Sequence, residues 1–242
     1  TGWFKGVDGK WRFEINDSDA TLKKEAIGKM FTDVAVRRMK TSRSLSLGNV
    51  LDHPRLFAAY PFMKSYRVMM DLDATQGGSF EGDAEGWGRI TLNAKGDHLS
   101  TLLHEIQHSI QTREGFASGG NVNDEIRSAH ALLGGASPEK GKSLAQYAFN
   151  RYKRLAGEVE ARNTQARRSM TEAERRATPP SETADVADAA AIVVFNGKEM
   201  AAPKEMLGSS EVYASLSSRA LDLADSFTGP SVKTLGSLNN VV

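Results

Sequence analysis

Two histidines four residues apart, His104 and His108, are the side chains whose types and spacing point most clearly to chemistry. On a helix, residues at positions i and i+4 share one face, so a single ion can meet a nitrogen of each imidazole. Glu105 beside them completes an H-E-x-x-H pattern, in which the carboxylate accepts a proton from a water held by zinc. The pattern predicts a Zn²⁺ site that activates water, with Glu105 as the general base.

The alternative interpretation is two unrelated helix histidines, either solvated or packed. With five histidines in 242 residues, a chance match to the whole pattern is expected about once in a hundred sequences or less. Leu102, Leu103 and Ile106 make the rest of this helix apolar, and buried His and Glu side chains need polar partners. We therefore favour the metal interpretation.

A catalytic zinc site usually has three protein ligands and one open position. Gln111 and Glu114 follow the motif, so the class with a third histidine at short spacing is disfavoured. The remaining option is a glutamate on a later helix, and Glu158 and Glu160 follow about fifty residues downstream. Two acids two positions apart on a helix point about 200° apart, so only one of them can face the metal.

The elements that must hold these residues are predicted from periodicity and capping. Alternating apolar and polar residues over 10–15, after the Asp8-Gly9 turn dipeptide, predict an N-terminal hairpin. Strands are expected at 66–72 and 88–93. Helices are expected at about 21–38, 98–113, 123–133, 142–170 and 209–227, with a short helix after the capping box at 171–174. Strands first and helices after favour an α+β fold.

Composition excludes several classes of function. The chain has no cysteine, which rules out disulfides, thiolate metal sites and cysteine nucleophiles, and fits a reducing compartment. Lys and Arg (31) nearly balance Asp and Glu (30), so the net charge of +1 gives no reason to expect nucleic acid or a membrane as a partner. No apolar run approaches the roughly 20 residues of a membrane span.

Several segments together resemble peptidase-like modules of the large polyvalent proteins encoded by phages and mobile elements. These segments are STLLHEIQH (100–108), REGFA (113–117), GG (119–120), GWFKGVDGKWRFEI (2–15) and VLDHP (50–54). The resemblance covers roughly residues 2–185. It implies a module of a longer multidomain polypeptide, located in the cytoplasm or associated with the virion and delivered into the host cytoplasm.

A second resemblance concerns the third ligand. In gluzincin-type zinc peptidases this ligand often stands in an E-x-x-A-D string, and Glu158 has Ala161 in the corresponding place. The resemblance implies Glu158 as the third ligand, with Glu160 as the second choice. Arg162 departs from the pattern, because these families often carry Asp or Asn there, so the group that orients the ligating histidine stays open.

The function expected from these features is that of a zinc-dependent endopeptidase acting on a peptide or protein substrate. We expect a zincin-like domain over 1–185, in which a small hairpin and helix region (1–45) packs on a mainly helical part, and a helical extension over 186–242. The alternative is a non-catalytic module in a phage-encoded multidomain protein, where the metal staples two helices.

Two supporting roles are left with several candidates. In peptidases of this kind an edge strand pairs with extended substrate, and the strand at 88–93 is either that edge or an ordinary core strand. An oxyanion formed during peptide hydrolysis needs a stabilising donor. The candidates for this donor are His130, Tyr147, Tyr152 and Arg162.

Overall fold

The computed structural model describes residues 2–36, 40–74, 77–134, 137, 139, 141–195 and 197–200. It confirms a mixed α+β fold with small sheets. The helix expected at 209–227, and with it most of the expected extension 186–242, lies outside the described residues. Within those residues, no helix combines the length and apolar character needed to cross a membrane.

The largest sheet has four strands in the order β4-β6-β8-β7. Their bounds are Leu45–Ser46 (β4), Arg67–Asp71 (β6), Gly78–Gly82 (β7) and Gly88–Asn93 (β8). The strands β6 and β8 run parallel, whereas β4 and β7 pair antiparallel at the two ends. Because β8 is hydrogen-bonded on both sides, the edge-strand interpretation of 88–93 is wrong, and β7 is the edge beside it.

Further helices and short strands make up the rest of the described chain. The helices are α1 (Lys24–Val36), α2 (Leu47–Val50), α3 (Pro54–Ala59), α4 (His98–Glu114), α5 (Val122–Leu133), α6 (Leu144–Arg154), α7 (Ala156–Arg167), α8 (Glu172–Ala177) and α9 (Pro180–Thr183), with 3-10 turns η1 (Pro61–Ser65) and η2 (Asp188–Ala190). The remaining strands are β1 (Trp3–Lys5), β2 (Trp11–Phe13), β3 (Thr21–Leu22), β5 (Leu51–Asp52), β9 (Val193–Phe195) and β10 (Lys198–Met200).

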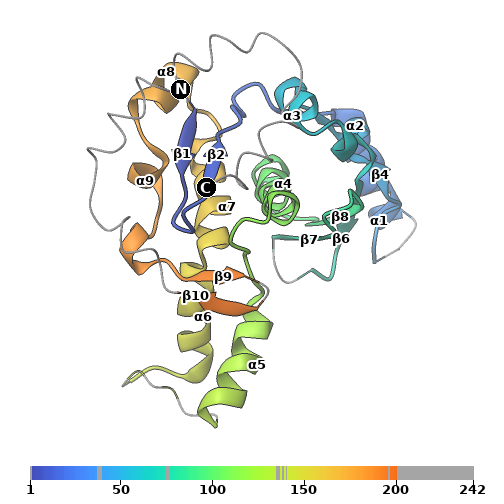
Figure 1. The fold of residues 1–242 in the computed structure, drawn as a ribbon. Helices are drawn as coiled ribbons and strands as arrows, with labels where there is room; N and C mark the ends of the chain where they lie inside the picture. The colour runs from blue at the N-terminus through green and yellow to red at the C-terminus, as the bar shows by residue number, and fades with distance from the viewer. Residues whose placement is uncertain are drawn as a thin grey trace.

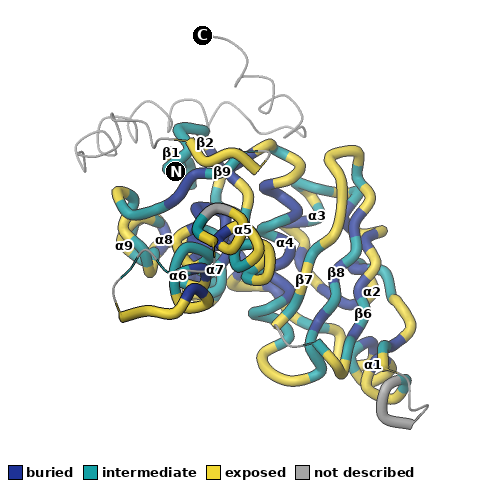
Figure 2. Tube along the Cα trace, turned by 90° about the horizontal axis from the view of Figure 1, so that it is seen from below, coloured by how far each residue is buried: buried dark blue, intermediate teal, exposed yellow. Residues whose placement is uncertain are grey.

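The motif helix α4 lies between the sheet and α7 (Figure 1). Its apolar face, which includes Leu102, Leu103 and Ile106, packs into one core with Val68 of β6 and Ile90 of β8. Buried residues accordingly gather along α4 and the elements that face it (Figure 2). The opposite face of α4 is left to meet α7, and this contact is the one that matters for the site.

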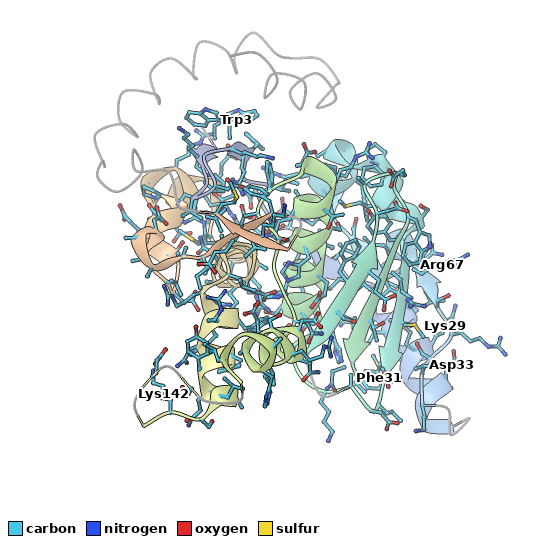
Figure 3. The ribbon with its side chains drawn as sticks, turned by 60° about the horizontal axis from the view of Figure 1, so that its bottom comes forward. Trp3, Lys29, Phe31, Asp33, Arg67 and Lys142 are labelled. Atoms are coloured by element: carbon cyan, nitrogen blue, oxygen red, sulfur yellow. The ribbon has the colours of Figure 1, made fainter. Side chains whose placement is uncertain are left out.

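Both ends of α4 are fixed by residues that the sequence identifies. Asp97 caps the N-terminus by accepting a hydrogen bond from the backbone N–H of Ser100, at 3.0 Å. Gly115 ends the helix in the left-handed conformation (φ 64°), which glycine adopts at little cost. Phe31 of α1 is labelled in Figure 3. Its ring meets His98, near the start of α4, edge-on, with ring centroids 5.5 Å apart. The helix that carries the motif is therefore capped at both ends.

The expected helix 142–170 is two helices, and its break bears on the site. Leu155 is extended (φ −57°, ψ 128°) and forms a parallel bridge with Ile192. The backbone N–H of Ala156 donates to the carbonyl of Ile192 at 2.8 Å. Because α7 starts afresh there, Glu158 stands in its first turn, where the helix dipole favours a carboxylate.

The predicted N-terminal hairpin is confirmed, with Trp3 of β1 opposite Phe13 of β2. It lies beside α7 rather than on the main sheet (Figure 1). Glu14, just after β2, forms an ion pair with Arg167 of α7, at 2.6 Å, and with Arg175 of α8. Both arginines are buried, so these contacts tie the N-terminal hairpin to α7 and α8.

Candidate metal centre

One turn of α4 presents His104 and His108 on the same side. Their Nε2 atoms lie 3.1 Å apart, and the two side chains are only 14% and 16% exposed. Glu105, the residue between them in the motif, is buried with 5% of its surface exposed. The helix therefore brings the three motif residues to one partly sheltered place, as the sequence predicts.

The third residue of the cluster comes from α7. An oxygen of Glu158 lies 3.5 Å from Nε2 of His104, and its other oxygen lies 3.3 Å from Nε2 of His108. These three side chains form a group whose ligand atoms could hold a metal ion, found among the residues that the structure describes. The distant partner expected from the sequence thus lies beside the two histidines.

The separations within this group fit a tetrahedral ion. Zn–ligand bonds of about 2.0–2.1 Å place neighbouring ligand atoms of a tetrahedron about 3.3 Å apart. The nitrogen–nitrogen distance of 3.1 Å lies near that value, as do the distances of 3.3 Å from His108 to one oxygen of Glu158 and of 3.5 Å from His104 to its other oxygen. A single ion could therefore contact all three side chains without a rearrangement of the backbone.

The tautomer of His108 follows from its hydrogen-bond partner. Its Nδ1 lies 2.9 Å from Oε1 of Gln111. The amide of Gln111 has this orientation because its Nε2 donates to the carbonyl of Gly157 (2.9 Å) and to Glu160 (3.0 Å). Nδ1 of His108 must therefore carry the proton, which leaves the lone pair of Nε2 free in the neutral ring.

The same holds for His104. Its Nδ1 lies 3.1 Å from Oε1 of Gln165, on α7. The Nε2 of Gln165 donates to the carbonyl and hydroxyl of Ser100, at 3.2 and 3.0 Å. With both Nδ1 atoms donating, two imidazole lone pairs and a carboxylate converge on one point, and such a point favours a positive charge, either a metal ion or a proton.

Glu158 has a free acceptor atom aimed at this point. Its side chain is 1% exposed, one oxygen accepts from the N–H of Gly120 at 2.9 Å, and the other has no hydrogen-bond partner. Burial alone raises the pKa of this carboxyl, but the two histidines and Gly120 outweigh burial and lower the pKa well below its usual value. Glu158 is thus ionised and could act as a ligand to a cation.

The charges of the cluster also shift the other two motif groups. Burial on its own lowers the pKa of His108, but Glu158 and Glu105 more than compensate and raise it to about 9. A proton on His108 thus supplies the missing cation when no metal is bound. The pKa of Glu105 is raised, first by burial and further by Glu158, while the histidine charges oppose the shift.

The loop after α4 runs directly over the ligands. A Cβ at Gly119 would collide with His108 and with Glu158, and a Cβ at Gly157 would collide with the backbone of the same loop. Ser118 holds the loop from outside, because its N–H donates to the carbonyl of Val194 in β9, at 3.1 Å. Glycine is required here for close approach.

The sheet edge reaches the other side of the site. A Cβ at Gly78 of β7 would lie 2.9 Å from Oε1 of Glu105 and 2.7 Å from Thr101. The N–H of Asn93 donates to the carbonyl of Gly77, and that of Asp83 donates to Trp87, so odd-numbered residues of β7 bond to β8. The backbone groups of Gly78, Phe80 and Gly82 therefore face away from β8, at the open edge.

Glu160, the second choice for the third ligand, lies elsewhere. One of its oxygens lies 2.6 Å from Nε of Arg12 and the other accepts from Gln111.

The sequence analysis did not predict the two glutamines that contact the histidines, Gln111 and Gln165. Gln111 stands three residues after His108 and shares its helix face, which is a usable signal. No local signal marks Gln165, because its contact depends on how α7 packs on α4.

The four candidates for the donor that stabilises the oxyanion lie at different places in the structure. The hydroxyl of Tyr152 neighbours Glu158, and its pKa is raised first by burial and then by that carboxylate. Arg162 is bound by Asp185 at 2.7 and 3.0 Å. Tyr147 packs in the small core between α5 and α6, and His130 is exposed on α5. Of these four side chains, Tyr152 is the one that contacts Glu158.

Comparison with known proteins bears on the N-terminal segment. A family model described as large polyvalent protein associated domain 23 matches residues 1–23. Neither a curated protein nor a solved structure matches the chain. The match supports an association of this chain with large polyvalent proteins and hence a place within a larger multidomain polypeptide.

Proposed function

We propose that this chain is a zinc-dependent peptidase with His104, His108 and Glu158 as metal ligands and Glu105 as the general base. The observation that carries the proposal is the convergence of two imidazole lone pairs and an unpartnered carboxylate oxygen on one point. Two nitrogens and one carboxylate form the donor set of a catalytic zinc site, which leaves the fourth position open.

The chemistry divides between the ion and the chain. A bound zinc ion supplies a Lewis acid that lowers the pKa of its water toward about 7. Glu105 accepts a proton from the attacking water and passes it to the leaving amine. Its raised pKa suits the first step, because a carboxylate whose pKa lies closer to neutrality accepts a proton more readily than an ordinary carboxylate.

A polypeptide is the substrate class that the surroundings favour. The open edge of β7 offers the backbone groups of Gly78, Phe80 and Gly82, and Gly78 lies beside Glu105. An extended peptide can add to such an edge through main-chain hydrogen bonds, which would hold its carbonyls along the site. The antiparallel edge strand beside the motif helix, with a glutamate on a later helix, also supports our proposal of a zincin-like fold.

Tyr152 is the donor that we assign to the oxyanion. Its raised pKa keeps the phenol protonated at neutral pH, so the hydroxyl can donate to an oxygen that gains negative charge. It neighbours Glu158, so its hydroxyl would be close to a carbonyl oxygen bound at the same site. Glu105 would act on the same carbonyl from the side of β7.

The proposal is tested by metal content and peptide cleavage in two variants. Wild-type protein should bind about one zinc per chain and cleave unstructured polypeptides. Glu105→Gln should keep the zinc and lose cleavage, because it loses the base and no ligand. His104→Ala should lose both. Zinc retained by His104→Ala would contradict the ligand assignment, and zinc without cleavage in wild type would favour a metal-stapled structural module.

A further inference from the structure

A line of buried polar contacts leads away from His108 toward the N-terminus. Gln111 receives the Nδ1 proton of His108 on its Oε1, at 2.9 Å. Its Nε2 donates to an oxygen of Glu160 at 3.0 Å. The other oxygen of Glu160 lies 2.6 Å from Nε of Arg12, which is in β2 of the N-terminal hairpin. Three steps therefore connect a ligand on α4 to a residue nearly one hundred positions earlier.

The hairpin end of this line is held rigidly. Arg12 is 5% exposed, and two of its nitrogens bind the two oxygens of Asp8 at 2.6 and 2.7 Å. The ring of Phe116 lies 4.0 Å from its guanidinium. The N–H of Ala117 donates to Asp8 at 2.8 Å, and Lys10 donates to the carbonyl of Gly115. The hairpin thus binds residues 115–117, at the start of the loop that passes over His108 and Glu158.

Glu160 and the backbone carbonyl of Gly157 together decide which way the Gln111 amide faces. An ionised carboxylate is only an acceptor, so Glu160 requires the NH₂ end of Gln111 to point toward it. The carbonyl end must then face His108, which keeps the proton on Nδ1 and the lone pair on Nε2. Arg12 holds Glu160 in place through the ion pair between its guanidinium and the Glu160 carboxylate.

We propose that Arg12 is a positioning residue for the metal centre, acting through Glu160 and Gln111 on the orientation of His108. The inference rests on the proposed zinc site. It makes the N-terminal hairpin, whose residues lie within the segment matched by the polyvalent-protein family model, a structural part of that site. The chain would then bind zinc tightly only while the hairpin is docked on α4 and α7.

The first test compares zinc affinity, measured by competition with a chromophoric chelator, in Arg12→Met and a matched control. Loss of such a supporting contact typically weakens metal binding about 10–100-fold, and this is the loss expected for Arg12→Met. The control is Arg175→Met, which also removes a buried arginine that binds this hairpin, through Glu14, without reaching a ligand. The control should bind zinc within about twofold of wild type.

A second variant covers the case in which Arg12→Met does not fold. Glu160→Gln keeps the size of the side chain and most of its surroundings but adds a donor that can turn the Gln111 amide around. It should weaken zinc binding in the same direction, with a circular dichroism spectrum like that of wild type. Cobalt substituted for zinc should show an altered visible spectrum in Glu160→Gln and an unaltered one in Arg175→Met.

A double-mutant cycle tests the route. If Arg12 acts through Gln111, adding Arg12→Met to Gln111→Leu should weaken zinc binding by less than twofold further. Full additivity of the two losses, or equal affinities of Arg12→Met and Arg175→Met, would overturn the inference and leave the proposed peptidase intact. Zinc binding that depends on Arg12 in a chain without cleavage would retain the inference and refute the peptidase. A wild-type chain that binds no zinc would overturn both.

Discussion

At the scale of single residues, the positions of the imidazole protons of His104 and His108 determine which nitrogens could bind a metal. Gln111 and Gln165 accept from the Nδ1 atoms of the two histidines, so both Nε2 atoms turn lone pairs toward Glu158. Without a cation, the proton that His108 retains offsets the repulsion between these groups, which is the reason for its raised pKa. Metal and proton therefore compete for one position.

This competition predicts proton release on zinc binding. With its pKa raised to about 9, His108 is protonated at pH 7 in the metal-free chain, and it must lose that proton to become a ligand. Glu158, whose pKa is lowered, is already ionised and releases none. Calorimetry in buffers of different ionisation enthalpy should give about one proton per zinc at pH 7 from this group. The contribution should vanish as pH rises through about 9.

The same competition between proton and metal predicts that the affinity for zinc depends on pH. The apparent affinity for zinc should rise with pH up to about 9, since fewer protons then have to be displaced from His108. Zinc binding at pH 7 with no proton uptake by the buffer would mean that His108 is neutral in the free chain, contrary to this account of the cluster.

Local spacing in the sequence predicts the two proposed histidine ligands but not the side chains that hydrogen-bond to them. His104, Glu105 and His108 could be identified from the sequence because helix geometry alone places them together. Glu158 needed a resemblance as well, because α4 and α7 meet only through tertiary packing. Gln165 and Arg12 could not be identified, since nothing near them in the chain distinguishes a supporting side chain from an ordinary polar one.

At the scale of elements, the site is a junction of α4, α7 and the edge strand β7. The start of α7 depends on a strand-like bridge between Leu155 and Ile192, residues 37 positions apart. Helical periodicity through 142–170 conceals this break, because the competing hydrogen bonds come from a distant segment. The strands 67–71 and 88–93 and the caps of α4 were predictable, because their signals are local.

The contact between β7 and Glu105 predicts the effect of Gly78→Ala. The new Cβ would lie 2.9 Å from Oε1 of Glu105 and 3.0 Å from the carbonyl of Thr91, so the carboxylate or the strand must move. We expect zinc content to stay unchanged while kcat falls about 100-fold, the cost of misplacing a catalytic group by about 1 Å.

Gly28→Ala is the matched control for that substitution. Gly28 lies in α1, and no atom approaches the position of its Cβ within 4 Å. The change should raise the free energy of unfolding by about 0.5–1 kcal/mol, because alanine is the better helix former, and leave kcat unchanged. Equal kcat values for the two variants would remove β7 from the description of the site.

At the scale of the whole molecule, the candidate metal centre lies where two parts of the chain pack together through α4 and α7. Its ligands come from α4, which packs on the main sheet, and from α7, which packs on the N-terminal hairpin and the β9 segment (Figure 1). An ion held by both helices binds the folded chain and not the unfolded one, so metal binding and folding are linked.

This linkage predicts a gain in stability with zinc. At free zinc 100-fold above Kd, the free energy of unfolding should rise by about 2.7 kcal/mol, measured by denaturant titration with and without a chelator. Glu105→Gln should show the same gain, because Glu105 is not a ligand, whereas His104→Ala should show none. A gain of equal size in His104→Ala would place the stabilising ion elsewhere.

The most direct measurement of the central claim is X-ray absorption at the zinc edge of the chain loaded with one equivalent of zinc. The account predicts four light ligands at about 2.0–2.1 Å, two of them imidazoles, one the carboxylate of Glu158 and one an oxygen from solvent. His104→Ala should lose one imidazole signal. A wild-type spectrum with fewer than two imidazoles, or with six oxygen ligands, would contradict it.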